Sequence, residues 1–331
     1  MDRHAIITGG AGFIGSHMVD LLLAEGGWQV TVIDNFDPCY PRASKEANIA
    51  QHRNNGAFEL VEGDILDDAD LIRAFARSKG NSPVVMHFAA KVGVRPSLSD
   101  PLGYHRVNTT GTLKLLEQAR RASASHFIFA SSSSVYGETP DAPWTEESHG
   151  LRPISPYAVS KIAAEEFVRV HARLHGMPAT ILRFFTAHGP RQRPDLAIHS
   201  FFHAIRNELP VRQFGDGSSS RDYTYVGDIA RGVRGAIDRK LGEPQGQQCE
   251  TFNLGNSHTT TLLELIAAIE KETGRSAIID RQPAQPGDVS LTCADITKAR
   301  AHLGYAPDTS LSEGLRLFNA WFSDRDRVVL A

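Results

Sequence analysis

The chain has 331 residues, enough for one large domain or two modest ones with a substantial core. Its formal net charge of −3 lacks the basic excess that nucleic-acid-binding and membrane-surface proteins use. The 3 cysteines are an odd number without CxxC spacing, which argues against a disulfide framework or a zinc site and for a reducing compartment. Without a signal-peptide pattern or a membrane-spanning apolar stretch, we expect a cytoplasmic protein with no metal and no nucleic-acid or membrane partner.

Between residue 4 and about residue 185, short apolar runs alternate with helical patterns, as in βαβ units with a mostly parallel sheet. Six strands are expected, over residues 4–8, 29–33, 58–62, 84–88, 126–131 and 179–183. Helices are expected between them, for example over residues 68–77, 109–122 and 156–175. This pattern predicts an α/β protein of the Rossmann type, with a doubly wound parallel sheet that binds ligands at the carboxyl ends of its strands.

Beyond residue 183 the spacing loosens, and prolines and glycines separate shorter elements. We therefore expect two lobes, residues 1–185 and a smaller C-terminal α/β lobe over residues 186–331, with some crossing of the chain between them. One helix in the second lobe is predicted just after a run of threonines that can cap its start. Its apolar positions fall at helical spacing and are expected in the core: Leu262, Leu265, Ile266 and Ile269.

A glycine-rich segment, TGGAGFIGSH, follows the first expected strand and places Gly9, Gly12 and Gly15 at a turn into a helix. Glycines there permit a tight turn, a close approach to a pyrophosphate and close packing of the helix. Asp34 ends the second strand, near the offset of about 20 residues expected for an acid that binds the adenosine ribose. Its carboxylate repels a 2′-phosphate, which favours NAD over NADP. Asp64 is a candidate adenine contact, with an ordinary surface-loop aspartate as the alternative.

A Tyr-Lys pair lies in the segment YAVSK, on the helix that Pro156 opens. Tyr157 and Lys161 are four residues apart, so both project from one face of that helix. Ser132 ends the preceding strand within SSSSVYG. A phenol with a pKa of about 10 needs roughly 4 kcal/mol of phenolate stabilisation to act as a base near pH 7, which an ammonium and a nicotinamide cation can supply. The pair alone is common on exposed helices, and its combination with the glycine turn and the serine favours a catalytic site.

These motifs, in this order, resemble the extended short-chain dehydrogenase/reductase family along nearly the whole chain. Further shared segments are HFAA at 87–90 and RDYTYVGDIA at 221–230. Within the family, GVRPS at 93–97, LRFFTAHGPRQRPD at 182–195 and QPGDV at 285–289 look most like UDP-glucuronate 4-epimerases. The resemblance implies that residues 1–185 bind NAD and residues 186–331 bind a nucleotide sugar.

The resemblance also assigns site residues. Ser132, Tyr157 and Lys161 match the catalytic trio. The last two also match NAD contacts, together with Gly9, Gly12, Phe13, Ile14, Gly15, Asp34, Asn35, Asp64, Ile65, Phe88, Ala89 and Ala90. Arg221 and Asp288 match residues that hold the UDP pyrophosphate and ribose, and Thr186 and Arg193 match residues beside the sugar carboxylate. The expected substrate contacts are completed by Arg95, Ser133 and Ser134.

The residues at two positions distinguish this chain from related enzymes with two other activities. The 4,6-dehydratases carry an Asp-Glu pair where Ser133 and Ser134 stand, and UDP-glucuronate decarboxylases typically carry a glutamate at the position of Ser134. Without an acid there, elimination of water is disfavoured. Two departures from the family pattern, Lys91 and His188, bear on the fine choice of substrate rather than on the reaction.

The resemblance implies NAD-dependent C4 epimerisation of a UDP-sugar, UDP-glucuronate to UDP-galacturonate, through a 4-keto intermediate and hydride return. The alternative within the class is a UDP-glucose or UDP-N-acetylglucosamine 4-epimerase. In such an enzyme Arg193 binds a substrate phosphate, has a structural role or forms only a loop salt bridge. A net dehydrogenase or reductase and a non-catalytic NAD-binding protein are further alternatives. Family members commonly pair through helices like those at 109–122 and 156–175, so we expect a homodimer.

Overall fold

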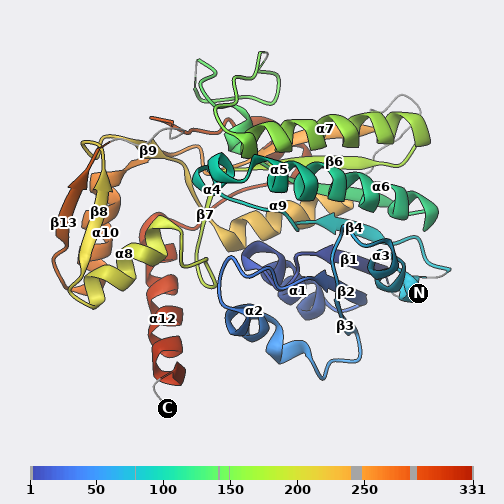
Figure 1. Cartoon of the computed structure of the whole chain (residues 1–331), viewed down its shortest axis with the longest axis horizontal. Helices are drawn as coiled ribbons and strands as arrows, with labels where there is room; N and C mark the ends of the chain where they lie inside the picture. The colour runs from blue at the N-terminus through green and yellow to red at the C-terminus, as the bar shows by residue number, and fades with distance from the viewer. Residues whose placement is uncertain are drawn as a thin grey trace.

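A computed structural model of the chain describes residues 3–329 except 79, 141, 149, 240–247 and 284–288, with side chains up to residue 324 (Figure 1). Its centre is a seven-stranded parallel sheet in the order β11-β6-β5-β4-β1-β2-β3. The strands are β1 (Arg3–Thr8), β2 (Trp28–Asp34), β3 (Phe58–Glu62), β4 (Val84–His87), β5 (His126–Ser132), β6 (Ala179–Phe184) and β11 (Cys249–Leu254). This strand order is that of a doubly wound sheet, so the expected fold class is confirmed.

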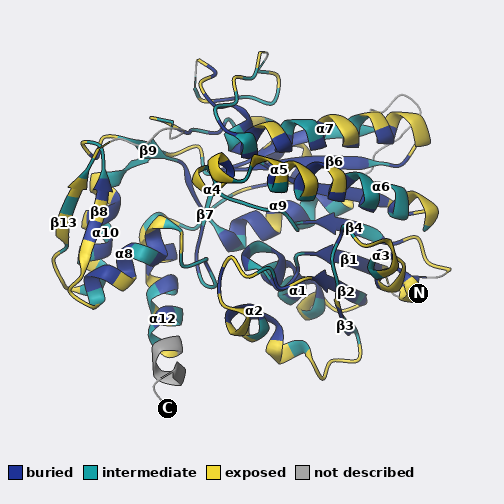
Figure 2. Cartoon of the chain, viewed as in Figure 1, coloured by how far each residue is buried: buried dark blue, intermediate teal, exposed yellow. Residues whose placement is uncertain are grey.

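Helices cover both faces of this sheet, which is why its strands are buried in Figure 2. One face carries α3 (Asp68–Ala74), α6 (Thr112–Arg121) and α7 (Pro156–His175). The other carries α1 (Phe13–Glu25), α9 (Val226–Asp238) and α11 (Thr297–Leu303). Successive strand residues point to opposite faces, so Ile6 belongs to the first core while Ala5 and Ile7 belong to the second. A strand covered on both sides reads as a continuous apolar run, which explains the run in β1.

Short helical segments follow several of the strands. They are α2 (Arg42–Ile49), η1 (Ala50–His52), η2 (Ala76–Ser78), α4 (Val94–Ser99), α5 (Pro101–His105), the π-helical η3 (Arg106–Gly111) and η4 (Ser133–Val135). The helix expected at 109–122 thus divides into η3 and α6, and the one expected at 68–77 ends earlier, before η2. The helix expected at 156–175 has the predicted bounds.

The C-terminal part of the chain forms a third hydrophobic core on α8 (Ala197–Arg206), α10 (Leu262–Thr273) and α12 (Leu311–Val329). Beside it, β8 (Pro210–Phe214) pairs in parallel with β13 (Ile278–Gln282). Two short ladders join β7 (Thr186–His188) to β10 (Tyr223–Tyr225) and β9 (Ser220–Arg221) to β12 (Thr260–Thr261). As predicted, threonine caps α10: Thr261 and Glu264 form a reciprocal capping box.

The six expected strands are present, and the seventh, β11, was not predicted. Its sequence CETFNL places Glu250 and Asn253 in a strand, and Asn253 is fully buried. The Asn253 side chain is satisfied by Tyr136 and by the backbone of Trp144, both more than 100 positions away. Through β11, α9 and α11 the chain after residue 185 returns to the main sheet. The division into lobes at residue 185 stays a prediction.

Within the part of the chain that the structure describes, no helix is both long and apolar enough to cross a membrane.

Candidate active site

The site lies where the strand connections change direction. From β1 the chain proceeds to β2 and β3 on one side, and β4, β5 and β6 then follow on the other side of β1. In an open parallel sheet this arrangement leaves a crevice at the carboxyl ends of the strands. Gly9 follows β1, Phe88 follows β4, and Ser132 ends β5. The topology thus brings the predicted cofactor and catalytic residues to one edge of the sheet.

The glycine turn has the geometry of an anion cradle. Gly9 has φ +68°, and a Cβ there would lie 2.8 Å from the backbone nitrogen of Ala89. A Cβ on Gly15 would collide with the carbonyl oxygen of Gly9. Gly12 begins α1 without a side-chain cap, so the first N–H groups of the helix are left for an anion. Phe13 and Ile14 lie in the first turn of that helix. The turn fits a dinucleotide pyrophosphate.

The predicted adenosine side is also assembled. The buried Asp34 carboxylate accepts the backbone N–H groups of Ala11 (3.1 Å) and Phe36 (2.9 Å), which places it against the glycine turn. Burial raises the pKa of Asp34, while these hydrogen bonds act in the opposite direction. The Asn35 amide donates to Asp64 at 3.1 Å. Asp64 also accepts the N–H of Leu66 in its own loop at 2.8 Å, as an ordinary loop aspartate would, and its adenine contact stays a prediction.

Four other predicted cofactor residues follow β4 or β3 in the chain. Phe88 stacks on Phe184 with 6.2 Å between ring centroids. The Ala89 N–H donates to the Thr8 hydroxyl at 3.1 Å, and Ala90 follows it after β4. Ile65 is buried, and Gly111 leaves the space that its side chain occupies.

The three predicted catalytic residues come together at the start of α7. Ser155 caps this helix by accepting the N–H of Ala158 at 3.2 Å, and Tyr157 follows in the first turn. The Tyr157 hydroxyl is hydrogen-bonded to Ser132. Ser132 Oγ also donates to Ser134 Oγ and accepts the Ser134 N–H, both at 3.1 Å. Ser133 is buried and Ser134 half-buried beside them.

The electrostatics of Tyr157 and Lys161 are set mainly by burial. Burial raises the pKa of Tyr157, while the hydrogen bond with Ser132 and the charge of Arg193 oppose that rise. Burial lowers the pKa of Lys161 to about 7, against the opposing charge of Glu165. Lys161 Nζ donates to the backbone oxygen of Ala130 at 2.8 Å. The protein's own groups therefore leave the phenol protonated at neutral pH.

Arg193 is a predicted substrate residue whose charge acts on Tyr157. Its side chain is only 15% exposed, and Nε and Nη2 donate to the two Asp195 oxygens at 2.9 and 2.7 Å. The predicted loop salt bridge is therefore present. The charge of the same guanidinium opposes the burial-driven rise in the pKa of both Tyr104 and Tyr157.

Three other predicted substrate residues lie in β7, β9 and α4. Thr186 begins β7 and donates its N–H to the Asp222 backbone at 3.0 Å. Arg221, in β9, is half-buried. Arg95, in α4, lies over the ring of Phe214 at 4.4 Å from its centroid, a contact between the two parts of the chain. Asp288 lies outside the described residues.

The two departures from the family pattern have different surroundings. Lys91 Nζ pairs with Asp100 at 2.8 Å. His188 is fully buried, edge-on to the rings of Tyr223 and Tyr225.

Sequence reasoning missed a buried polar network under the catalytic residues. Glu165 is fully buried and accepts from Ser131 Oγ (2.6 Å), Arg183 Nη2 (2.8 Å) and Arg169 Nη2 (2.9 Å). Arg183 donates onward to the Tyr136 hydroxyl at 3.1 Å. Ser131 directly precedes Ser132, so the network fixes the end of β5. Two features of the sequence could have indicated this network. Glu165 lies one helical turn after Lys161, and Arg183 interrupts the apolar run of β6.

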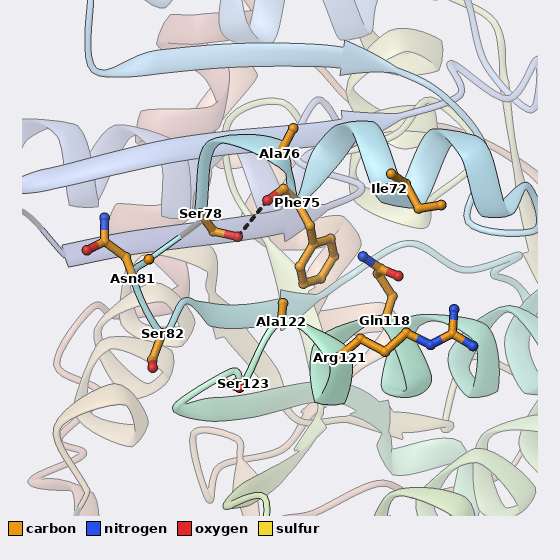
Figure 3. Close-up of a pocket in the computed structure, with 11 residues that line it drawn as sticks. Ile72, Phe75, Ala76, Ser78, Asn81, Ser82, Gln118, Arg121, Ala122 and Ser123 are labelled. Atoms are coloured by element: carbon orange, nitrogen blue, oxygen red, sulfur yellow. Dashed lines mark hydrogen bonds between the residues drawn. The ribbon is translucent and has the colours of Figure 1, made fainter.

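A hollow of about 640 Å³ lies between the end of α3 and the end of α6 (Figure 3). Its lining includes Phe75, Ser82, Gln118 and Ser123. Ser82 and Ser123 come just before β4 and β5, so the hollow is at the amino ends of the strands, opposite the crevice. No predicted site residue in the described part of the chain lines it, and we assign it no function.

Residues 6–318 match the model of a family described as GDP-mannose 4,6 dehydratase. The chain is 38% identical over 313 residues to an uncharacterized UDP-glucose epimerase of Bacillus subtilis, covering 94% of this chain and 95% of that one. It is 34% identical to a UDP-glucuronate 4-epimerase of Thermodesulfobacterium geofontis, covering 98% and 97%. A crystal structure of UDP-glucuronic acid 4-epimerase from Bacillus cereus, in complex with UDP-glucuronic acid and NAD, matches with a TM-score of 0.90, at 35% identity over 98% of this chain and 100% of that one.

The chain therefore belongs to the extended short-chain dehydrogenase/reductase family, in the group described as GDP-mannose 4,6 dehydratase. The resemblance predicted from the motifs is confirmed.

Proposed function

We propose that this protein is an NAD-dependent 4-epimerase of UDP-sugars, with UDP-glucuronate as substrate and UDP-galacturonate as product. The observation that carries the proposal is that Ser132, Tyr157 and Lys161 come together at the end of β5, at the same edge of the sheet as the glycine turn that follows β1. The relatives and the solved structure named above, which bear the names of UDP-sugar epimerases, support it. Residues 1–185 would hold NAD, and residues 186–331 would hold the sugar nucleotide.

The chain's own groups account for the proton transfers. Tyr157 removes the proton of the C4 hydroxyl, and Ser132, hydrogen-bonded to that phenol, orients the same hydroxyl. Lys161, buried with a pKa of about 7, supplies positive charge to the site when protonated. The glycine turn and the start of α1 would hold NAD, which would supply the hydride acceptor for C4 and the donor for its return to the opposite face of the sugar. Because the hydride returns to the sugar that gave it, no net oxidation occurs.

The serines after Ser132 support epimerisation over dehydration, although the family model is described as a dehydratase. Elimination of water needs a proton donor and a base at the positions of Ser133 and Ser134. Ser133 is buried, and Ser134 is hydrogen-bonded to Ser132. Neither hydroxyl has the acidity of a carboxylic acid.

A glucuronate substrate adds a requirement that Arg193 can meet. Its 4-keto form is a β-keto acid, which loses carbon dioxide when the bond to the carboxylate stands perpendicular to the ketone plane. A guanidinium has five N–H donors, and the pair with Asp195 uses those on Nε and Nη2. Its remaining donors can bind the sugar carboxylate and hold it in the ketone plane.

The alternative is a UDP-hexose 4-epimerase, in which Arg193 only pairs with Asp195. The pair itself and the name of the Bacillus subtilis relative favour this reading. A panel of UDP-sugars, incubated singly with the protein and analysed for product stereochemistry, separates the two. Conversion of UDP-glucuronate in preference to UDP-glucose supports the proposal, and the reverse preference replaces it with the hexose reading.

We also propose that two copies pair through α7. Val159, Phe167, Val170 and Leu174 are exposed on this helix although they are apolar, and Leu174 is 70% exposed. Positions 159, 170 and 174 recur on one face of a helix, so they form a stripe that a second copy can cover. A monomer mass in light scattering at micromolar concentration would contradict this pairing. The reducing cytoplasm remains the proposed location.

A further inference from the structure

A cluster of metal-ligating side chains lies on α6 and α7, which run side by side in Figure 1. Glu117 belongs to α6, and His171 and His175 are one turn apart at the end of α7. One ligand atom from each of the three lies within 4.8 Å of the others. His171 Nε2 is 3.2 Å from Glu117 Oε1, and the two imidazole centroids are 4.5 Å apart.

We propose that Glu117, His171 and His175 form a binding site for a divalent transition-metal ion of the Zn²⁺ class. Tetrahedral Zn²⁺ with nitrogen and oxygen ligands at about 2.0 to 2.2 Å sets neighbouring ligand atoms about 3.3 Å apart. The distance from His171 Nε2 to Glu117 Oε1, 3.2 Å, is close to this value. His175 is exposed, so its ring can rotate by the small amount that remains.

Two features of the surroundings favour a cation here. The His171 side chain is only 6% exposed, and its Nε2 is directed at Glu117 Oε1, so burial holds one ligand nitrogen toward the cluster. The helix α7 ends at His175, with Gly176 as its left-handed cap, so the negative end of the helix dipole lies at the cluster.

Arg120 places a positive charge beside Glu117, which works against the binding of a cation. Its Nη2 donates to Glu117 Oε2 at 2.9 Å, which leaves Oε1 directed toward His171. Such an outer partner orients a ligating carboxylate, although its positive charge weakens the affinity. The ion would then have three protein ligands and an open position toward solvent.

The ion is structural rather than catalytic. His171 and Tyr157 are 14 residues apart in α7, about 21 Å along the helix. The site would tie α6 to the last turn of α7 and stabilise the folded chain by mass action. The inference does not rest on the proposed epimerase activity.

The test uses the tag-free full chain after treatment with a chelator. Zn²⁺ binding is measured by calorimetry, and Co²⁺ binding by its visible absorption. We expect one ion per chain and a rise in Tm on adding Zn²⁺. His175→Ala and Glu117→Gln should weaken Zn²⁺ binding by at least about 10-fold, the effect typical of losing even an outer partner.

The matched control is His203→Ala, an exposed helical histidine in α8, which should bind Zn²⁺ as the wild type does. Because His175 is exposed, its replacement should leave the fold intact, and circular dichroism checks this. Absence of stoichiometric Zn²⁺ binding by the wild type overturns the proposal. Equal binding by the wild type and the His171→Ala/His175→Ala double variant overturns it too, and the contact is then a plain Glu-His hydrogen bond.

Discussion

The glycine turn and the loop around Arg193 meet at one edge of the sheet, but they depend on different interactions. The turn is held by backbone atoms: Gly9 closes against Ala89, and Gly15 against Gly9. The Arg193 loop is held by charged side chains, through its pair with Asp195 and the pair of Arg191 with Asp20 in α1 at 2.7 Å. We call the glycine turn the cofactor wall and the loop around Arg193 the substrate wall. A small steric change should therefore impair the cofactor wall, while loss of a charge should selectively impair the substrate wall.

The largest loss of activity is expected from a substitution at Tyr157, the proposed base. Tyr157→Phe removes one hydroxyl and leaves both walls in place, so turnover should fall about 10²- to 10⁴-fold or more while NAD is retained. Steady-state assays and cofactor analysis of the purified protein measure both. The control is Tyr104→Phe, because the Tyr104 hydroxyl donates to the Val92 backbone at 2.8 Å. If activity of Tyr157→Phe falls less than roughly tenfold, another base operates.

The next largest effect is expected on stability, from a substitution in the buried network around Glu165. Glu165→Ala leaves the buried charge of Arg183 unpaired, which should lower the free energy of unfolding by about 3 to 5 kcal/mol. Its neighbour Glu166 pairs with Arg169 at the surface, so Glu166→Ala should cost at most about 1 kcal/mol. Urea unfolding of the two variants gives the comparison. Equal losses would mean that the Glu165 contacts contribute no more than a surface pair.

The substrate wall alone is tested by Arg193→Ala. Loss of a charge-assisted hydrogen bond of roughly 1.5 to 3 kcal/mol should lower kcat/KM for UDP-glucuronate about 10- to 150-fold. UDP-glucose should suffer much less, and the residual turnover should release UDP-pentose by decarboxylation. Product analysis by mass spectrometry measures all three.

Asp195→Ala is the matched control for that variant, because it breaks the pair but keeps the guanidinium. It should retain the preference for UDP-glucuronate. Equal loss of both substrates in Arg193→Ala would show that this arginine does not clamp a carboxylate.

The cofactor wall alone is tested by Gly15→Ala. The added Cβ collides with the Gly9 carbonyl, so the turn must shift, at a cost of about 1 to 3 kcal/mol in stability. The bound NAD should be lost with it. Gly56→Ala is the control, since no atom of the described residues lies within 4 Å of a Cβ at that position. Full retention of NAD by Gly15→Ala would mean that the turn is not the pyrophosphate cradle.

A contrast between local sequence patterns and contacts of residues far apart in the chain explains which features the sequence could predict. The fold class, the six strands and the glycine turn depend on local patterns of apolar residues and glycines, and these can be identified along the chain. The strand β11 escaped prediction because the distant Tyr136 and Trp144 satisfy its buried Asn253. The Glu165 network escaped for the same reason, since Arg183 and Ser131 come from other strands. The contact of Arg95 with Phe214 likewise depends on the tertiary arrangement.

The central claim is that each hydride returns to the sugar that donated it. The most direct test incubates the purified protein with UDP-glucuronate and no added cofactor, and follows UDP-galacturonate by chromatography and NADH by absorbance in the same sample. The account predicts many turnovers per chain, approach to a mixture of both sugars, and no accumulation of NADH beyond one equivalent per site. NADH that rises in proportion to product would contradict it and make the protein a net dehydrogenase.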